Sequence, residues 1–123
     1  MTTDLPVAQL KSELFKALAH PIRVRALERL VAGEESVGEL ADQLGVEVTQ
    51  LSQQLAVLRR ASVVSTRRDG NTIYYSVRDP RMAKLLVVAR GLVVSNLEDS
   101  RSILVSLEEE GIEASGATQT STS

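Results

Sequence analysis

The sequence predicts a mostly helical α+β domain in which four helices precede a single β-hairpin and a long helix follows it. Three observations carry this prediction. Apolar residues recur at intervals of three and four over five separate stretches, which is the period of an amphipathic helix. One stretch alternates β-branched and aromatic residues around Asp69-Gly70, the pattern of a tight hairpin. Apolar residues make up 43% of the chain but aromatic residues only 2%, so we expect an aliphatic core between helices.

The length of 123 residues suits one domain, which we place at residues 6–110. Residues 1–5 are expected to be a flexible tail, and residues 111–123 a disordered one, because they offer little apolar surface to bury. The absence of cysteine excludes disulfides and thiolate metal sites. Because the chain has neither an apolar run of membrane-spanning length nor a signal-peptide pattern, we expect a cytoplasmic protein without membrane contact.

The first two helices are expected at residues 6–18 and 21–31, separated by His20-Pro21. A proline disfavours helical conformation in the residue before it and suits the first position of the next helix. The second helix turns Ile22, Ala26, Leu27 and Leu30 inward. Its Arg23 fits an internal ion pair as well as a phosphate contact.

The next two helices are expected at residues 37–44 and 49–61. Ser36 is a suitable N-cap for the first of them, with Glu39 completing a capping box, and Gly45 is suited to end it. Two helices joined by a few residues that include glycine form a helix-turn-helix, whose second helix reads the major groove of DNA. The second helix here turns three leucines inward, and its outer face is rich in amides and hydroxyls that can read base edges.

The hairpin is expected from strands at residues 63–68 and 72–77, with Tyr75 packed inward and Tyr74 exposed. A helix-turn-helix followed by such a hairpin is a winged helix-turn-helix. Arg67 and Arg68 point to opposite faces, so we expect one to reach DNA and the other to pair with an acid.

The net charge of −2 argues weakly against a nucleic-acid partner, but the distribution favours one. Residues 48–78 contain five arginines and one aspartate, a net of +4, whereas the rest contains nine basic and fifteen acidic residues, a net of −6. The candidate contacts to double-stranded DNA are Thr49, Gln50, Ser52, Gln53, Gln54, Arg59, Arg67, Arg68, Asn71 and Tyr74.

The last helix is expected at residues 81–110, roughly 45 Å at 1.5 Å per residue, which is longer than a small domain needs. An apolar stripe on such a helix suggests pairing with a second copy of the chain. The alternative is a break near Gly91 or Ser95-Asn96 that folds the helix back on its own core. The expected homodimer interface comprises Leu10, Leu14 and Phe15 of the first helix and Leu85, Leu86, Leu92, Val93, Leu97 and Leu104 of the last.

Several motifs occur in a recognisable order and spacing, namely FKALAHPIR at 15–23, VGELA at 37–41, LSQQL at 51–55, LRRA at 58–61, RRDGN at 67–71 and Tyr74-Tyr75. Over residues 8–95 the chain thereby resembles the ArsR/SmtB family of bacterial transcriptional regulators. The resemblance implies a homodimeric winged-helix protein with an interface built from helices before and after the DNA-reading helix-turn-helix. It also implies binding to a two-fold-related operator and release when an effector, often a metal ion, binds. We expect repression, with activation as the alternative that the sequence leaves open.

The chain departs from the family at several positions. Gln54 and Ser62 stand where the family has histidine and glycine, and the change at Gln54 bears on base preference. Ser36 and Gly38 stand where thiolate sensors carry cysteines, and no histidine follows Asp99 as in the zinc sensors. Neither metal site of the family can therefore be transferred to this chain.

His20 is the only imidazole, and we interpret it first as a fold residue at the helix junction. The alternative is an effector site for nickel, zinc or cobalt formed by His20 with Glu98 or Asp99. No cofactor is otherwise required. With one histidine, no cysteine and no phosphate-binding glycine loop, the chain offers little for an enzyme. A helical dimerisation module that acts through a partner protein is a further alternative, which the arginines of the hairpin disfavour.

Overall fold

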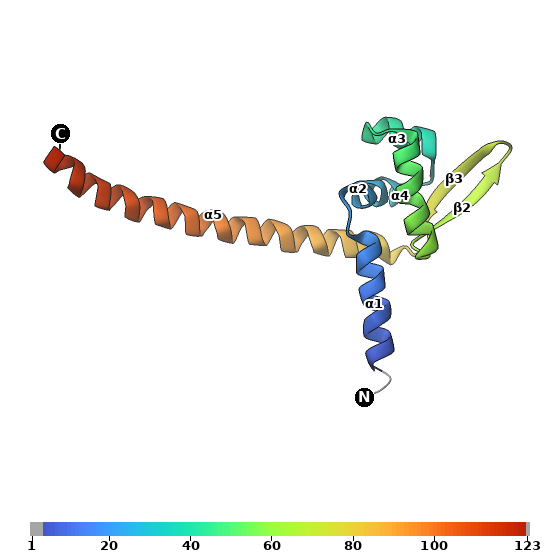
Figure 1. Ribbon diagram of the computed structural model, residues 1–123, viewed down its shortest axis with the longest axis horizontal. Coiled ribbons are helices and arrows are strands. Elements are labelled where there is room, and N and C mark those ends of the chain that lie inside the picture. Colours follow the sequence, from blue (N-terminus) through green and yellow to red (C-terminus); the bar gives the residue numbers. More distant parts are fainter. Residues whose placement is uncertain (1–3, 123) are drawn as a thin grey trace. The chain divides into compact units, whose positions relative to one another are not determined.

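The computed structural model describes the backbone of residues 4–122 and the side chains of residues 5–111 (Figure 1). The chain divides into two compact units, Met1–Lys84 and Leu85–Ser123. The elements are α1 (Asp4–Leu18), α2 (Pro21–Leu30), β1 (Glu35–Ser36), α3 (Val37–Leu44), α4 (Val48–Arg60), β2 (Val64–Asp69), β3 (Thr72–Val77) and α5 (Arg81–Thr122). The predicted winged helix-turn-helix is confirmed, with the boundaries of α2, α3, α4 and the hairpin within one residue of those expected.

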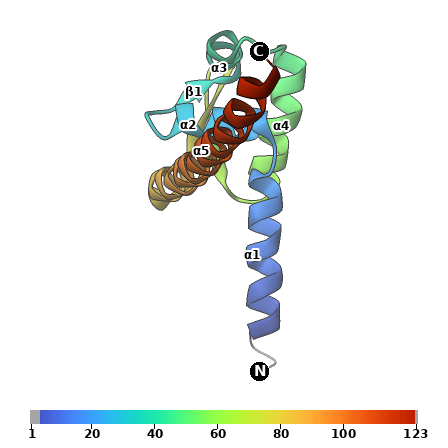
Figure 2. The same cartoon turned by 90° about the vertical axis from the view of Figure 1, so that its left-hand side faces the viewer.

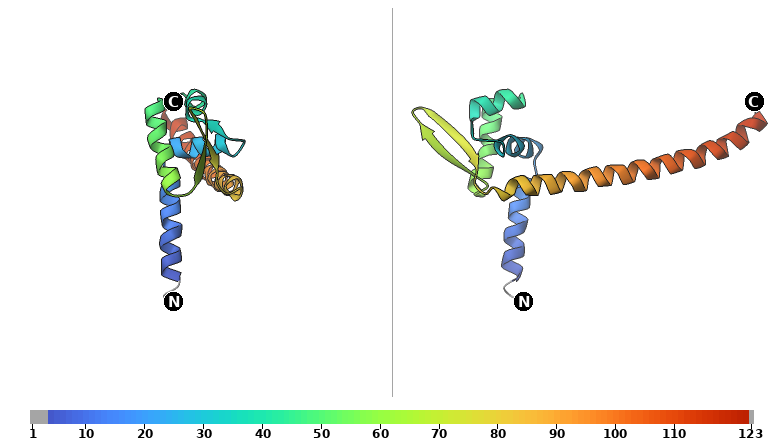
Figure 3. Two further views of the ribbon diagram at one scale, coloured as in Figure 1. Left: turned by 90° about the vertical axis from the view of Figure 1, so that its right-hand side faces the viewer. Right: turned by 180° about the vertical axis from the view of Figure 1, so that it is seen from behind.

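The core of the first unit lies between α2, α3, α4 and the base of the hairpin. Its largest fully buried side chains are those of Leu27, Leu40, Leu51, Leu55 and Leu58. Figure 2 shows α1 extending away from the group formed by α2, α3 and α4, and Figure 3 shows the β2–β3 hairpin projecting beyond these helices. The aliphatic core that the composition predicts is therefore assembled within residues 21–77, which we call the reading unit.

The junction of α1 and α2 is held by side chains that close the helix ends. The backbone N–H of Ile22 donates to Nδ1 of His20 at 3.1 Å, so His20 is the N-cap of α2, and Pro21 follows at the first helical position. Arg23 Nη1 donates to the carbonyl oxygen of Ala17 at 3.0 Å. The interpretation of His20 as a fold residue is confirmed, and Arg23 makes an internal hydrogen bond to the backbone.

The turn between α3 and α4 follows from local chemistry. Ser36 Oγ accepts from the backbone N–H of Glu39 at 3.2 Å, which confirms Ser36 as the N-cap of α3. Gly45 adopts φ 66° and ψ 37°, the left-handed conformation that glycine tolerates best. Helix α4 begins at Val48, so Thr49 lies within its first turn rather than at its cap.

The sheet contains a strand that the sequence did not predict. β1 pairs antiparallel with β3, placing Glu35 opposite Tyr75 and Ser36 opposite Tyr74, and the strand order is β1-β3-β2. The predicted hairpin is confirmed, but the prediction missed β1, because a two-residue strand has no alternation to detect. β2 pairs with β3 in a register that places Arg67 opposite Tyr74.

Helix α5 runs without a break from Arg81 to Thr122, which confirms the predicted single long helix over the alternative of a break near Gly91 or Ser95-Asn96. The predicted end at Glu110 is wrong, because the helix continues beyond it. No proline occurs after its start, and each glycine within it costs only about 1 kcal/mol relative to alanine. Residues 1–3 and 123, which belong to the two predicted tails, lie outside the described residues. Within the part that the structure describes, no helix is long and apolar enough to cross a membrane.

Candidate nucleic-acid interface

Helix α4 presents a polar face because its leucines fix the opposite face in the core. Leu51, Leu55 and Leu58 are completely buried, at the three- and four-residue spacing of one helical side. Among the predicted base-reading residues, Thr49, Gln50 and Gln53 are exposed, whereas Ser52 and Gln54 are half-buried. The amide and hydroxyl groups of this face are those that bind base edges in a major groove.

Two arginines, Arg59 and Arg60, end α4, and both are exposed. Their position at a helix C-terminus favours positive charge whether or not a phosphate is bound. A DNA contact by Arg59 stays a prediction.

The two arginines of the hairpin have different surroundings. Arg67 Nε donates to Glu34 Oε2 at 2.8 Å and to Oε1 at 3.1 Å, and Nη2 also pairs with Oε1. Arg68 and Asn71 are exposed, and Arg68 makes no ion pair within the part of the chain that the structure describes. The expectation that one of these arginines pairs with an acid is confirmed, and that arginine is Arg67.

Tyr74 lies under the same guanidinium, whose central carbon is 4.5 Å from the centroid of the tyrosine ring. Both Tyr74 and Tyr75 are half-buried, so the expectation of one exposed tyrosine was wrong. Hydrogen bonding to Arg67 lowers the pKa of the Glu34 carboxyl, and the same bonding raises the pKa of Arg67. The pair is therefore ionised throughout the neutral range.

Arg29 connects α2 to α3 and approaches the first residue of β1. Arg29 Nε donates to Gln43 Oε1 at 2.8 Å, and Arg29 Nη2 lies 4.0 Å from Glu35 Oε1. The sequence did not predict roles for Glu34 and Glu35. The only signal was that the alternation of Arg67 and Arg68 required an acid near one of them.

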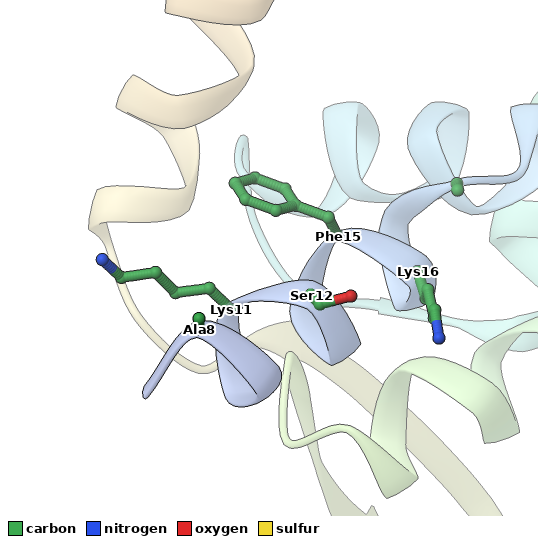
Figure 4. A pocket seen from close by; sticks show the side chains of 6 residues that line it. Ala8, Lys11, Ser12, Phe15 and Lys16 are labelled. Atoms are coloured by element: carbon green, nitrogen blue, oxygen red, sulfur yellow. The ribbon is translucent and has the colours of Figure 1, made fainter. Parts of the chain in front are cut away.

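The predicted dimer interface is largely exposed in the single chain. On α1, Phe15 lines a shallow pocket of about 500 Å³ with Ala8, Lys11, Ser12, Lys16 and Ala19 (Figure 4). Leu10 and Phe15 are exposed and Leu14 is half-buried. On α5 the exposed members of the predicted interface are Leu92, Val93, Leu97 and Leu104, whereas Leu85 and Leu86 are half-buried.

The candidate metal ligands are not assembled into a site. Among the described residues, no group of three or more histidine, aspartate or glutamate side chains is placed to hold a metal ion. His20 uses Nδ1 to cap α2, and Glu98 and Asp99 are exposed on α5. The metal response stays a prediction.

Comparison with known proteins identifies the family. A model of a helix-turn-helix domain matches residues 18–67. The HTH-type transcriptional regulator Rv0081 of Mycobacterium tuberculosis is 50% identical over 107 residues, covering 86% of this chain and 94% of the relative. A solution structure of the homodimeric winged helix-turn-helix domain of Mb0332 from Mycobacterium bovis, a possible ArsR-family regulator, aligns with a TM-score of 0.70 at 27% identity, covering 78% of this chain and 89% of that one. The chain belongs to the ArsR/SmtB family of winged helix-turn-helix transcriptional regulators.

Two crystal structures and a further relative also match most of the chain. The crystal structure of Rv0081 aligns with a TM-score of 0.70 and 54% identity, covering 76% of this chain and 95% of that one. The biofilm growth-associated repressor of Xylella fastidiosa is 44% identical over 75 residues, covering 61% of this chain and 66% of the relative. The crystal structure of the transcriptional repressor BigR from Xylella fastidiosa aligns with a TM-score of 0.66 and 38% identity, covering 75% of this chain and 95% of that one.

Proposed function

We propose that this ArsR/SmtB regulator is a cytoplasmic homodimeric repressor that binds a two-fold-related operator in double-stranded DNA. The observation that carries the proposal is the division of α4 into a fully buried leucine face and a polar face rich in amides and hydroxyls. The names of the relatives support it, because one solved neighbour is described as homodimeric and the Xylella proteins are described as repressors.

Dimerisation places two copies of the DNA-binding surface along one duplex. Two reading helices related by a two-fold axis bind half-sites about 34–36 Å apart, one turn of the duplex. The exposed apolar side chains of α1 and α5, including Leu10, Phe15, Leu92 and Leu97, supply the surface for this pairing. Burying them between two copies removes apolar area from water, which is the main favourable term in association.

The contacts divide by chemistry. Arg59, Arg68 and Asn71 are suited to phosphates, which set the register of the protein on the duplex. Gln50 and Gln53 are suited to adenine, because an amide side chain matches the donor and acceptor of the adenine edge in the major groove. Sequence preference therefore depends on α4 more than on the hairpin.

A binding titration on DNA from upstream of the chain's own gene tests the proposal, with footprinting to locate the operator. If the dimer contacts about 6–10 phosphates, affinity falls about 10³- to 10⁵-fold between 50 and 200 mM salt. Gln53→Ala should reduce the preference for the operator over unrelated DNA more than it reduces binding to unrelated DNA. Glu28→Gln, a change on the exposed side of α2, is the control variant. Protection of a single half-site, or no duplex binding at 50 mM salt, would contradict the proposal.

A further inference from the structure

The contact between Glu34 and Arg67 crosses the whole width of the sheet. Arg67 lies on β2, at one edge, and Glu34 directly precedes β1, at the other edge. Tyr74 lies on β3 between them, and its ring lies under the guanidinium. One side chain thus connects the first strand of the hairpin to the loop after α2.

The contact between Glu34 and Arg67 lies at the point along the hairpin where the sheet changes from three strands to two. β1 contains only two residues, and Ser36 opposite Tyr74 is its last pair. Beyond that pair the hairpin continues to Asp69 and Thr72 as two strands alone. An isolated two-stranded ribbon is only marginally ordered in water. We call the β2–β3 hairpin the wing. Arg67 is anchored where β1 ends and the two-stranded part of the wing begins.

Because Arg67 is hydrogen-bonded to Glu34, it is poorly placed to contact a DNA phosphate at the same time. Its Nε and Nη2 both donate to the Glu34 carboxylate, which has the two-oxygen geometry that a guanidinium binds best. The central carbon of the guanidinium lies over the Tyr74 ring, 4.5 Å from its centroid. Arg68 follows Arg67 on β2, so strand alternation places it on the opposite face, and it makes no ion pair among the described residues.

We propose that Glu34 is a positioning residue for DNA binding, which braces the wing through Arg67 and Tyr74 so that Arg68 and Asn71 meet the duplex in a fixed orientation. The proposal rests on the proposed function as a DNA-binding repressor. A braced wing loses less conformational freedom on binding than a loose one, so bracing strengthens binding without adding a contact to DNA. In this arrangement Arg67 acts through the wing, and Arg68 carries the phosphate contact.

Salt dependence separates the two roles, because only a residue that neutralises a phosphate contributes to the slope of log K against log salt. Glu34→Gln and Arg67→Gln should each weaken operator binding about two- to fivefold per wing, the size expected of an exposed but bidentate ion pair, with an unchanged slope. The double variant should be no weaker than either single one, since both remove the same brace. Arg68→Gln should lower the slope by about one per wing.

A charge exchange provides a rescue. Glu34→Arg combined with Arg67→Glu keeps the net charge and restores an ion pair across the sheet, so it should recover part of the lost affinity. Glu28→Gln, which removes a carboxylate from α2, controls for the general effect of charge on DNA affinity. Circular dichroism should confirm that every variant folds, because the pair is half exposed and outside the core.

Other results would overturn the brace. Tighter binding with a steeper slope in Glu34→Gln would mean that the carboxylate withholds Arg67 from DNA. A lower slope in Arg67→Gln, or no rescue by the charge exchange, would make Arg67 a phosphate contact. Equal operator affinity of Glu34→Gln and the Glu28→Gln control would show that the contact between Glu34 and Arg67 does not contribute to DNA binding. If the unaltered protein binds no duplex, the proposed function fails instead, and the two failures are distinguishable.

Discussion

Helices α4 and α5 carry similar sequence patterns but have opposite environments. Both space leucine and valine at intervals of three and four. In α4 the exposed fraction of Leu51, Leu55 and Leu58 is 0%, whereas in α5 Leu92 and Leu97 are each 64% exposed. The pattern therefore predicts a helix and its apolar face, but it does not say which molecule covers that face.

The difference follows from what the chain places near each helix. Short connections join α4 to α3 before it and to β2 after it, so its own neighbours cover its leucines. Large apolar side chains remain exposed along α5 from Val87 to Leu107, too many to be scattered surface residues of a monomer. We expect the stability contributed by α4 to be intramolecular, and that contributed by α5 to depend on a second copy.

The largest effect should come from truncating α4. Leu55→Ala should lower the free energy of unfolding by about 2–5 kcal/mol, because it leaves a cavity in a core with no exposed surface at this position. The loss should be the same at every protein concentration. Denaturant titration at several concentrations measures it.

Leu97→Ala is the matched change on α5. Its cost should shrink as the protein is diluted, because only the dimer buries this side chain. A concentration-independent loss as large as that of Leu55→Ala would show that the chain itself covers Leu97.

The next largest effect concerns assembly. Val93→Glu combined with Leu97→Glu should convert the dimer to a monomer at micromolar concentration, since burying unpaired carboxylates in an apolar interface is strongly unfavourable. Operator affinity should fall with it, as each half-site would then be bound separately. Sedimentation equilibrium and DNA titration measure the two effects.

The control for this change is Ser95→Glu combined with Ser102→Glu, which adds the same charge about half a turn around α5. It should leave the dimer intact. Dissociation by both pairs, or by neither, would mean that the apolar stripe does not define the interface.

The reading unit could be predicted from sequence because its signals are local. His20-Pro21, Ser36 and Gly45 act on backbone groups within a few residues, and all three close helix ends as expected. The leucine spacing of α4 likewise fixes its outer face without knowledge of distant residues.

The features that the sequence did not predict depend on contacts between residues far apart in the chain. β1 is defined by backbone hydrogen bonding to Tyr74 and Tyr75, and no pattern within two residues reveals it. Glu34 and Arg67 are 33 residues apart, so the sequence could indicate that one hairpin arginine needs an acid but not which acid. For the same reason the sequence predicts an exposed apolar stripe on α5 but not what covers it.

Substitutions at the ends of the helices should change the free energy of unfolding by less than the substitutions in α4 and α5. His20→Ala should lower the free energy of unfolding by about 1 kcal/mol, because the backbone N–H of Ile22 loses its acceptor at the start of α2. His20→Asn should retain most of the stability, since asparagine is a good N-cap. Chemical denaturation of the three proteins measures this. Equal losses in both variants would show that the imidazole does more than cap the helix.

The smallest effect should be at the start of α5, where Asp79 accepts a hydrogen bond from the backbone N–H of Arg81 at 2.9 Å. Hydrogen bonding to the Arg81 guanidinium lowers the pKa of Asp79 from 3.8 to about 2. Because the folded pKa lies below the unfolded one, Asp79 contributes stability above about pH 4 and loses it as pH falls toward 2. Thermal unfolding of Asp79→Asn should therefore differ from the unaltered protein at pH 5 and converge with it near pH 2. Asp99→Asn, which removes an exposed carboxylate from α5, is the control. Parallel curves for Asp79→Asn and the unaltered protein down to pH 2 would show that the carboxylate does not anchor the helix.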